Sequence, residues 1–223
     1  MSGETFRSGG SAYRITVNAA PAAGGKKWPV VMFVHGNFGL GAPYGDQIRK
    51  FANDLSALGY VTAVPQYYLD DGPHLDDTVP HVQTLTDAIA AVASRADADR
   101  DRLGLIGFSL GAATAMTFIA SNPPGTVKAL ADFFGFLTPT IRSAVSTFPP
   151  TIMLHNDDDQ IVSVENSREL DRLIPAAIDH RRVEYQEQWQ RVNHAFKPGD
   201  SADVLSQSEA TKWLTKHLPP IGK

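Results

Sequence analysis

Residues 103–113 read LGLIGFSLGAA, an apolar run that a single serine interrupts, with a glycine two positions to either side. This Gly-x-Ser-x-Gly spacing indicates a sharp turn at the serine where a strand precedes it and a helix follows it. Residues 102–108 are largely apolar, as in a buried strand, and residues 110–120 have a helical composition that ends before Pro123. The flanks therefore predict that Ser109 lies on a sharp strand-to-helix turn.

The same alternation of strand and helix patterns extends outward from this turn. It predicts strands over residues 29–36, 60–68, 102–108, 127–136, 150–156 and 181–189, and helices over residues 45–60, 79–96, 110–120, 164–174 and 202–218. The opening segment, through residue 18, is expected to add an antiparallel pair of strands at one edge. Short connections between alternating elements indicate an α/β fold with a mostly parallel sheet and helices on both faces. We expect a single domain over residues 1–223.

The composition excludes several function classes. The chain has 223 residues, of which 43% are hydrophobic and 20% charged, and its net charge of −4 is dispersed, so we expect neither nucleic acid nor a membrane as partner. The absence of cysteine removes disulfides, thiolate metal sites and a cysteine nucleophile. Residues 1–15 lack the pattern of a secretory signal, and the expected location is cytoplasmic. The sequence does not distinguish a monomer from a homodimer.

A serine on such a turn has two interpretations. A sharp strand-to-helix turn strains the serine backbone, requires small residues at positions 107 and 111, and lifts the hydroxyl above the carboxyl edge of the sheet. The backbone N–H of Leu110, at the start of the helix, then points toward a developing oxyanion. The alternative is a glycine-rich turn in which the serine only caps the helix.

Acidic and basic groups follow downstream in the order that a catalytic triad on this turn requires. Residues 151–163, TIMLHNDDDQIVS, place Asp157, Asp158 and Asp159 directly after a predicted strand, at the edge where ligand sites gather in open α/β sheets. His194 lies in a loop after the last predicted strand and before the closing helix. The order Ser, Asp, His favours nucleophilic catalysis over a structural serine.

At this point the chain resembles the α/β-hydrolase superfamily and, within it, the dienelactone hydrolase family. The resemblance spans residues 30–196 and is carried by four stretches in family order, namely VVMFVHGNFGL, LGYVTAVPQYY, RLGLIGFSLGA and HNDDDQIVS with the later NHAF. It implies an α/β-hydrolase fold without a large cap domain. Dienelactone hydrolases proper use a cysteine nucleophile and carry a glutamate where this chain has Gly36, so the resemblance implies a serine-nucleophile member.

The resemblance also implies roles for individual residues. Ser109 is the expected nucleophile and His194 the expected base. The family pattern Asp-x-x-Val matches Asp159 to Val162, so Asp159 is the expected acid rather than its two acidic neighbours. The expected oxyanion donors are the backbone N–H groups of Leu110 and Asn37, with Phe38 as the alternative in the next register.

The expected activity is hydrolysis of a small or medium carboxylic ester, thioester or lactone through an acyl-enzyme, with no metal and no cofactor. The short connection over residues 138–147 leaves little material for a lid. Aromatic residues near the carboxyl edge form the expected substrate pocket, with core packing as the alternative for each: Phe38, Tyr67, Tyr68, Phe134, Phe136, Trp189 and Phe196. Two alternative functions remain. One is an acyltransferase or peptidase on the same fold, and the other is a protein that binds a small ligand without catalysis.

Overall fold

The computed structural model describes residues 2–19, 25, 27–68 and 79–220. Its strands form one eight-stranded sheet in the order β1-β2-β4-β3-β5-β6-β7-β8. The strands are β1 (Ser2–Ser8), β2 (Ser11–Ala19), β3 (Trp28–Val34), β4 (Val61–Pro65), β5 (Ala98–Phe108), β6 (Val127–Phe133), β7 (Thr151–Asn156) and β8 (His180–Tyr185). β1 and β2 pair antiparallel, β2 joins β4 antiparallel, and all other pairs are parallel. The predicted α/β architecture and its antiparallel edge are confirmed.

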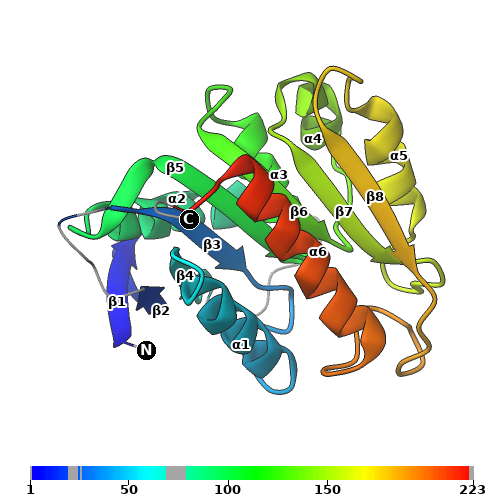
Figure 1. The fold of residues 1–223 in the computed structure, drawn as a ribbon, viewed down its shortest axis with the longest axis horizontal. Coiled ribbons are helices and arrows are strands. Elements are labelled where there is room, and N and C mark those ends of the chain that lie inside the picture. Colours follow the sequence, from blue (N-terminus) through cyan, green and yellow to red (C-terminus); the bar gives the residue numbers. More distant parts are fainter. Residues whose placement is uncertain (1, 20–24, 26, 69–78, 221–223) are drawn as a thin grey trace.

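Helices cover both faces of this sheet (Figure 1). They are α1 (Tyr44–Ser56), α2 (Val79–Ala93), α3 (Leu110–Ala120), α4 (Pro139–Ala144), α5 (Glu165–Leu173) and α6 (Ser201–His217), with a short 3-10 helix at Val145–Thr147. α1 and α6 lie in front of the sheet in Figure 1 and bury their apolar sides against one face. α2, α3, α4 and α5 contribute to the core on the other face. No helix in the described part of the chain combines the length and apolarity needed to cross a membrane.

The central strands are buried on both faces, which explains their continuous apolar sequence. Along β3, Val30, Met32 and Val34 pack into the core beneath α2 and α3, whereas Val31 and Phe33 pack beneath α1 and α6. Because β3, β5, β6, β7 and β8 run parallel, the loops that follow them emerge at one edge of the sheet. The segments that carry the expected catalytic residues are therefore neighbours in space.

Two predicted strands are longer than the observed ones, and one predicted connection contains a short helix. The strand predicted over residues 60–68 ends at Pro65, which has no N–H to donate to a neighbouring strand. The strand predicted over residues 127–136 ends at Phe133, because Phe134 turns the chain with a positive φ of 46°. The connection over residues 138–147 contains α4, which the Thr138 hydroxyl caps by accepting a hydrogen bond from the Ile141 N–H at 3.3 Å.

Candidate active site

Ser109 occupies the turn between β5 and α3 in a strained conformation. Its φ of 53° and ψ of −119° lie in a region that non-glycine residues rarely adopt. The Ser109 N–H donates to the carbonyl oxygen of Phe133 at 2.9 Å, and the Ser109 carbonyl accepts from the N–H groups of Ala112 and Ala113. The turn is therefore held by the neighbouring strand on one side and by the first turn of α3 on the other.

The glycines on either side of Ser109 are required by close backbone packing. A Cβ on Gly107 would lie 2.4 Å from the Cα of Ala112, and a Cβ on Gly111 would lie 2.0 Å from the carbonyl oxygen of Val34. Both distances are far below van der Waals contact. Only glycine at these positions lets α3 start this close to the ends of β3 and β5.

The structure brings Ser109, His194 and Asp159 into one hydrogen-bonded series. His194 Nδ1 lies 2.6 Å from Asp159 Oδ2, and His194 Nε2 lies 2.9 Å from Ser109 Oγ. An ionised carboxylate only accepts hydrogen bonds, so the proton sits on Nδ1 and leaves Nε2 free to accept from the serine hydroxyl. This is the orientation that a general base for Ser109 requires.

Asp159 is held as a carboxylate by its surroundings. Burial by itself would raise the pKa of Asp159, but hydrogen bonds from His155, His194 and the Val162 N–H outweigh it and lower the pKa to about 2. Its Oδ1 accepts from the N–H groups of Ile161 and Val162, each at 2.8 Å. Asp159 is therefore ionised at every pH at which the protein would be assayed.

A second histidine that the sequence analysis did not single out lies behind Asp159. His155 is fully buried at the end of β7, and its Nε2 lies 2.8 Å from the carbonyl oxygen of Val162 and 3.4 Å from Asp159 Oδ2. Since a carbonyl only accepts, Nε2 carries the proton and Nδ1 accepts from the Ser167 hydroxyl at 2.6 Å. His155 thus presents an N–H to the same carboxylate oxygen, Oδ2, that His194 contacts.

The other two aspartates of the acidic turn have separate partners. Asp158 Oδ2 accepts from Asn193 Nδ2 at 3.0 Å, and Asp158 Oδ1 accepts from Gln160 Nε2 at 2.6 Å. Asp157 accepts from the exposed Gln186 at 3.0 Å. Neither carboxylate is hydrogen-bonded to His194, so the geometry favours Asp159 among the three candidates.

Another buried carboxyl lies at the end of β6. Asp132 is 1% exposed, and its Oδ1 accepts from the Gly135 N–H at 2.8 Å. Its Oδ2 is buried without a hydrogen-bond partner among the described residues. Burial raises the pKa of Asp132 to about 6, although the nearby His155 and the Gly135 N–H act in the opposite direction.

Backbone strain in this protein gathers around Ser109. The five non-glycine residues with positive φ in the described part of the chain are Ser109, Phe134, Gln190, Asn193 and Ala195. Four of them line one cavity, and Asn193 directly precedes His194. Such clustering is typical of functional sites, because a strained backbone persists only where the surrounding structure holds it.

The cavity that contains Ser109 and His194 has a volume of about 310 Å³. Its wall combines loops after β3, β5, β6, β7 and β8 with the start of α1. The described residues that line it are Gly36, Asn37, Phe38, Gly39, Tyr44, Gln47, Ile48, Phe108, Ser109, Phe134, Ile161, Gln190, Val192, His194 and Ala195. Phe38, 76% exposed, stacks on Tyr44 at the entrance with ring centroids 6.0 Å apart.

Of the aromatic residues expected in the pocket, Phe38 and Phe134 line the cavity, and the Phe134 ring lies 5.0 Å from the His194 ring. Phe196, Phe136 and Trp189 do not line it. Phe196 is 2% exposed and lies below the cavity, Phe136 packs against the core beneath α2 and α3, and Trp189 packs edge-on against Tyr44. Their side chains pack against other apolar side chains, which is the commoner role of aromatic residues.

Tyr67 and Tyr68 also do not line the cavity, because they lie behind the loop that follows β3. The Tyr67 hydroxyl donates to the carbonyl oxygen of His35 at 2.7 Å. The Tyr68 hydroxyl lies 2.7 Å from the carbonyl oxygen of Gly36 and accepts from the Gly39 N–H at 2.8 Å. Burial raises the pKa of Tyr68 to about 12, so this hydroxyl stays a donor and fixes the loop.

The groups expected as oxyanion donors lie on the two loops that meet at Ser109. Asn37 lines the cavity together with Ser109, and a Cβ on the preceding Gly36 would lie 3.3 Å from the Cβ of Ser109. Leu110 is the first residue of α3, where helix geometry leaves the N–H without an intrahelical acceptor. Both N–H groups stay predictions as oxyanion donors.

Comparison with known proteins gives the family and the fold of the chain. A curated protein of Yersinia pestis named "Putative carboxymethylenebutenolidase" is 24% identical over 216 residues, which cover 85% of this chain and 79% of that protein. The crystal structure of a dienelactone hydrolase from Anabaena variabilis superposes with a TM-score of 0.77 at 19% identity, covering 97% of each chain.

Est1E from Butyrivibrio proteoclasticus superposes with the same TM-score of 0.77 at 12% identity, covering 97% of this chain and 99% of its own. At such identities these structures show the fold alone, which is the α/β-hydrolase fold. The sequence model of the dienelactone hydrolase family matches residues 15–217. Since this match includes the Ser109 turn, the acidic turn and the His194 loop, the chain belongs to the dienelactone hydrolase family.

Proposed function

We propose that the protein is a serine hydrolase that cleaves small or medium carboxylic esters, including thioesters and lactones, through an acyl-enzyme. One observation carries the proposal. His194 lies 2.9 Å from Ser109 Oγ through Nε2 and 2.6 Å from Asp159 Oδ2 through Nδ1, with the serine on a strained turn at the start of a helix. Nucleophile, base and orienting acid are thus within direct hydrogen-bond reach of one another.

In the first half of the reaction, Ser109 Oγ attacks the ester carbonyl carbon while His194 Nε2 takes the hydroxyl proton. Asp159 keeps the imidazole in the required tautomer and stabilises the imidazolium that forms. The N–H groups of Leu110 and Asn37 donate to the tetrahedral oxyanion, and each contributes about 3 kcal/mol if it acts as a typical oxyanion donor. The imidazolium then protonates the leaving alcohol or thiol as the ester bond breaks.

In the second half, a water molecule takes the place of the leaving group. His194 removes a proton from this water as its oxygen attacks the acyl carbon, and a second tetrahedral intermediate forms in the same oxyanion site. Its collapse breaks the bond between the acyl carbon and Ser109 Oγ, and His194 returns the proton to the serine. The carboxylic acid leaves, and the described residues complete the cycle without another chemical group.

The size of the cavity supports a limited substrate. About 310 Å³ is at the lower end of ligand pockets, which run from about 300 to 1,000 Å³. The family and the relative from Yersinia pestis, whose name denotes hydrolysis of a lactone, support ester chemistry in general. We therefore propose acyl groups of short or medium length rather than long lipid chains.

The test is hydrolysis of p-nitrophenyl esters from acetate to dodecanoate by the wild type and by Ser109→Ala. We expect turnover that peaks at a short acyl chain and disappears in the variant. A fluorophosphonate probe should label the wild type and not Ser109→Ala. A wild type that neither hydrolyses any ester nor takes the label would contradict the proposal and favour a ligand-binding protein. Product transfer to added alcohol in preference to water would favour an acyltransferase.

A further inference from the structure

We propose that the cavity next to Ser109 selects esters whose bound group is neutral and apolar, and that it excludes substrates that carry a carboxylate there. This inference rests on the proposed function and specifies its substrate class. It departs from what the relatives' name denotes, because a carboxymethylenebutenolide carries a carboxylate.

The lining of the cavity carries the argument. None of the described residues that line it is a lysine, arginine, aspartate or glutamate. The apolar side chains come from five different loops or helices and include Phe38, Ile48, Phe134, Ile161 and Val192. A carboxylate bound among them would lose its water without gaining a cation, and an unpaired buried charge is strongly unfavourable.

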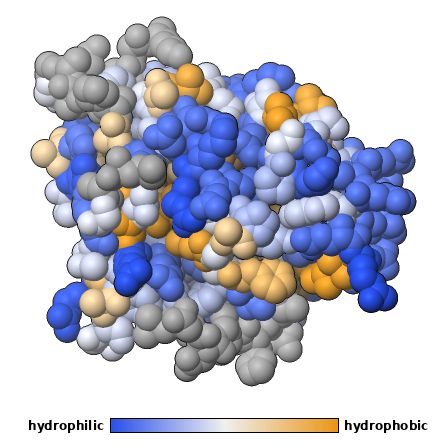
Figure 2. Space-filling model, turned by 90° about the horizontal axis from the view of Figure 1, so that it is seen from below, coloured by the Kyte–Doolittle hydropathy of each residue, from blue (hydrophilic) through white to orange (hydrophobic). Residues whose placement is uncertain are grey.

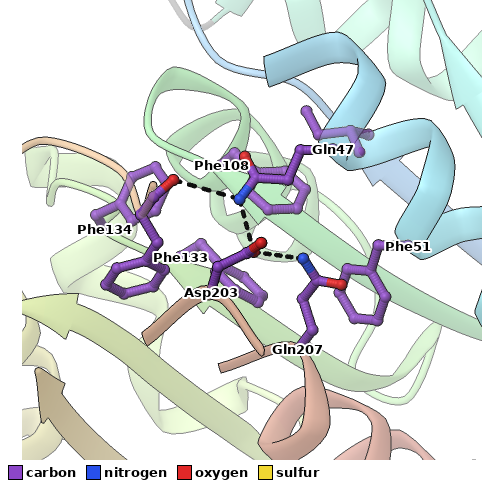
Figure 3. Close-up of a pocket in the computed structure, with 9 residues that line it drawn as sticks. Gln47, Phe51, Phe108, Phe133, Phe134, Asp203 and Gln207 are labelled. Atoms are coloured by element: carbon purple, nitrogen blue, oxygen red, sulfur yellow. Dashed lines mark hydrogen bonds between the residues drawn. The ribbon is translucent and has the colours of Figure 1, made fainter. Parts of the chain in front are cut away.

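Gln47, one of the neutral polar side chains that line the cavity, is already hydrogen-bonded within the protein. Gln47 Nε2 donates to Asp203 Oδ1 at 2.6 Å and lies 3.3 Å from the carbonyl oxygen of Phe196. Figure 3 shows Asp203 between the amides of Gln47 and Gln207, with phenylalanine rings around them. Turning the Gln47 amide toward an anionic ligand would leave the buried Asp203 carboxylate without one of its donors.

The charges that surround the cavity would also repel an anion. Asp203 is 6% exposed, and its Oδ2 accepts from the Gly199 N–H at 2.7 Å. Asp159 lies behind His194, and Asp158 lies on the same acidic turn. A carboxylate in the cavity would therefore face the negative charges of two buried carboxylates, Asp159 and Asp203.

Three arginines close in sequence or space to the cavity-lining loops are not among the residues that line it. Arg191 is exposed and, although it lies between Gln190 and Val192 in sequence, it is not among the residues that line the cavity. Arg14 and Arg49 line a neighbouring hollow that contains neither Ser109 nor His194. Arg49 is moreover paired with Asp46 at 2.6 Å.

Two exposed apolar side chains also line the cavity. Ile161 is 51% exposed and Phe38 76% exposed, and both line the cavity. Figure 2 views the molecule from below Figure 1 and shows hydrophobic side chains in small patches on a mostly hydrophilic face. An apolar acyl or alcohol group would cover such exposed side chains on binding, whereas a charged group would not.

The experiment compares two esters that differ only in charge at the end of the chain, p-nitrophenyl hexanoate and mono-p-nitrophenyl adipate. We expect kcat/KM for the hexanoate to exceed that for the adipate by about 100-fold or more, because transfer of the carboxylate from water into the cavity is unfavourable. Comparable values for the two esters would overturn the inference, while the proposed function would stand because both esters are cleaved.

A pair of substitutions at Ile161, one charged and one neutral, tests whether charge at the cavity wall determines this preference. Ile161→Lys should narrow the ratio between hexanoate and adipate by about tenfold or more, because it supplies the missing cation. Ile161→Gln, which is similar in length and neutral, should leave the ratio near that of the wild type. An equal effect of the two substitutions would show that charge at this wall does not determine the preference, and would overturn the inference.

A binding measurement tests the inference independently of turnover. Isothermal titration of Ser109→Ala with phenylacetamide and with phenylacetate compares a neutral ligand with an anion of nearly the same shape. We expect the amide to bind about tenfold more tightly or better. Equal or tighter binding of phenylacetate would overturn the inference even if no ester were hydrolysed, a result that would separately contradict the proposed function.

Discussion

Replacement of Asp159 by asparagine tests the proposed chemistry most sharply, because the side chain keeps its size and loses its charge. The oxygen of the asparagine is needed at the Oδ1 position, which accepts from the Ile161 and Val162 N–H groups, so the amide nitrogen faces His194 Nδ1. There it can only donate, which forces the imidazole into the tautomer with its proton on Nε2. That tautomer cannot accept the Ser109 proton. In a Ser-His-Asp triad this change lowers turnover by about 10⁴-fold, which corresponds to about 5 kcal/mol of transition-state stabilisation.

The neighbouring aspartates supply matched controls of identical chemistry. Asp158→Asn keeps one oxygen, which can still accept from either Asn193 or Gln160, the two partners of the wild-type carboxylate. Since neither partner is in the hydrogen-bonded series, turnover should fall by no more than about tenfold. Asp157→Asn changes an exposed contact with Gln186 and should leave turnover unchanged. Folding of each variant is checked by circular dichroism.

The assay is kcat for p-nitrophenyl butyrate at pH 8 for the wild type and the three variants. A loss in Asp157→Asn or Asp158→Asn as large as that in Asp159→Asn would refute the assignment of the acid. A loss below about tenfold in Asp159→Asn would refute the argument from tautomer control itself.

The remaining predictions concern stability at and near Ser109. Ser109→Gly should be more stable than Ser109→Ala by about 1 kcal/mol in urea unfolding, because glycine adopts a φ of 53° without strain, and equal stability would show that the turn is not strained. Gly111→Ala should lower the free energy of unfolding by more than about 3 kcal/mol, since its Cβ would lie 2.0 Å from the Val34 carbonyl oxygen, and a loss below about 1 kcal/mol would show that α3 can shift. The folded protein binds the Asp132 proton more tightly than the unfolded chain, with a pKa raised from 3.8 to about 6, so stability should fall as pH rises through this window, by about 3 kcal/mol in total. Asp132→Asn should therefore be more stable than the wild type at pH 8 and similar to it at pH 4, and a gain that does not depend on pH would contradict this origin.

The order of elements and the three residues of the hydrogen-bonded series were predictable because they depend on regular features of the chain. Strands buried on both faces have continuous apolar sequences, and the carboxyl ends of parallel strands meet at one edge. Ser109 and Asp159 follow such strands directly, and His194 lies in the loop after the last strand. Their proximity therefore follows from topology rather than from details of packing.

The cavity wall was much less predictable. Ile161, Gln190 and Val192 line it because loops fold back over the edge of the sheet, and no periodicity in the sequence indicates where an irregular loop will lie. Tyr68 was expected in the pocket, yet its hydroxyl holds the loop after β3 from behind. Aromatic residues near this edge of the sheet either line the pocket or pack behind its loops, and the path of the backbone determines which of the two occurs.

The hydrogen bonds around the strained residues explain why the position of the Ser109 hydroxyl can be rigid. The N–H of Ser109 donates to the Phe133 carbonyl at 2.9 Å, and the N–H of Phe134 donates to the Leu154 carbonyl at 2.9 Å, so the parallel ladder continues one residue beyond the ends of β5 and β6. Ser109 and Phe134, which both have unfavourable φ, thus remain bonded to the next strand. Releasing the strain at Ser109 would break this hydrogen bond and move the start of α3, where Gly111 leaves no room for movement. The sheet therefore fixes the hydroxyl relative to His194 before any substrate binds, as preorganised catalysis requires.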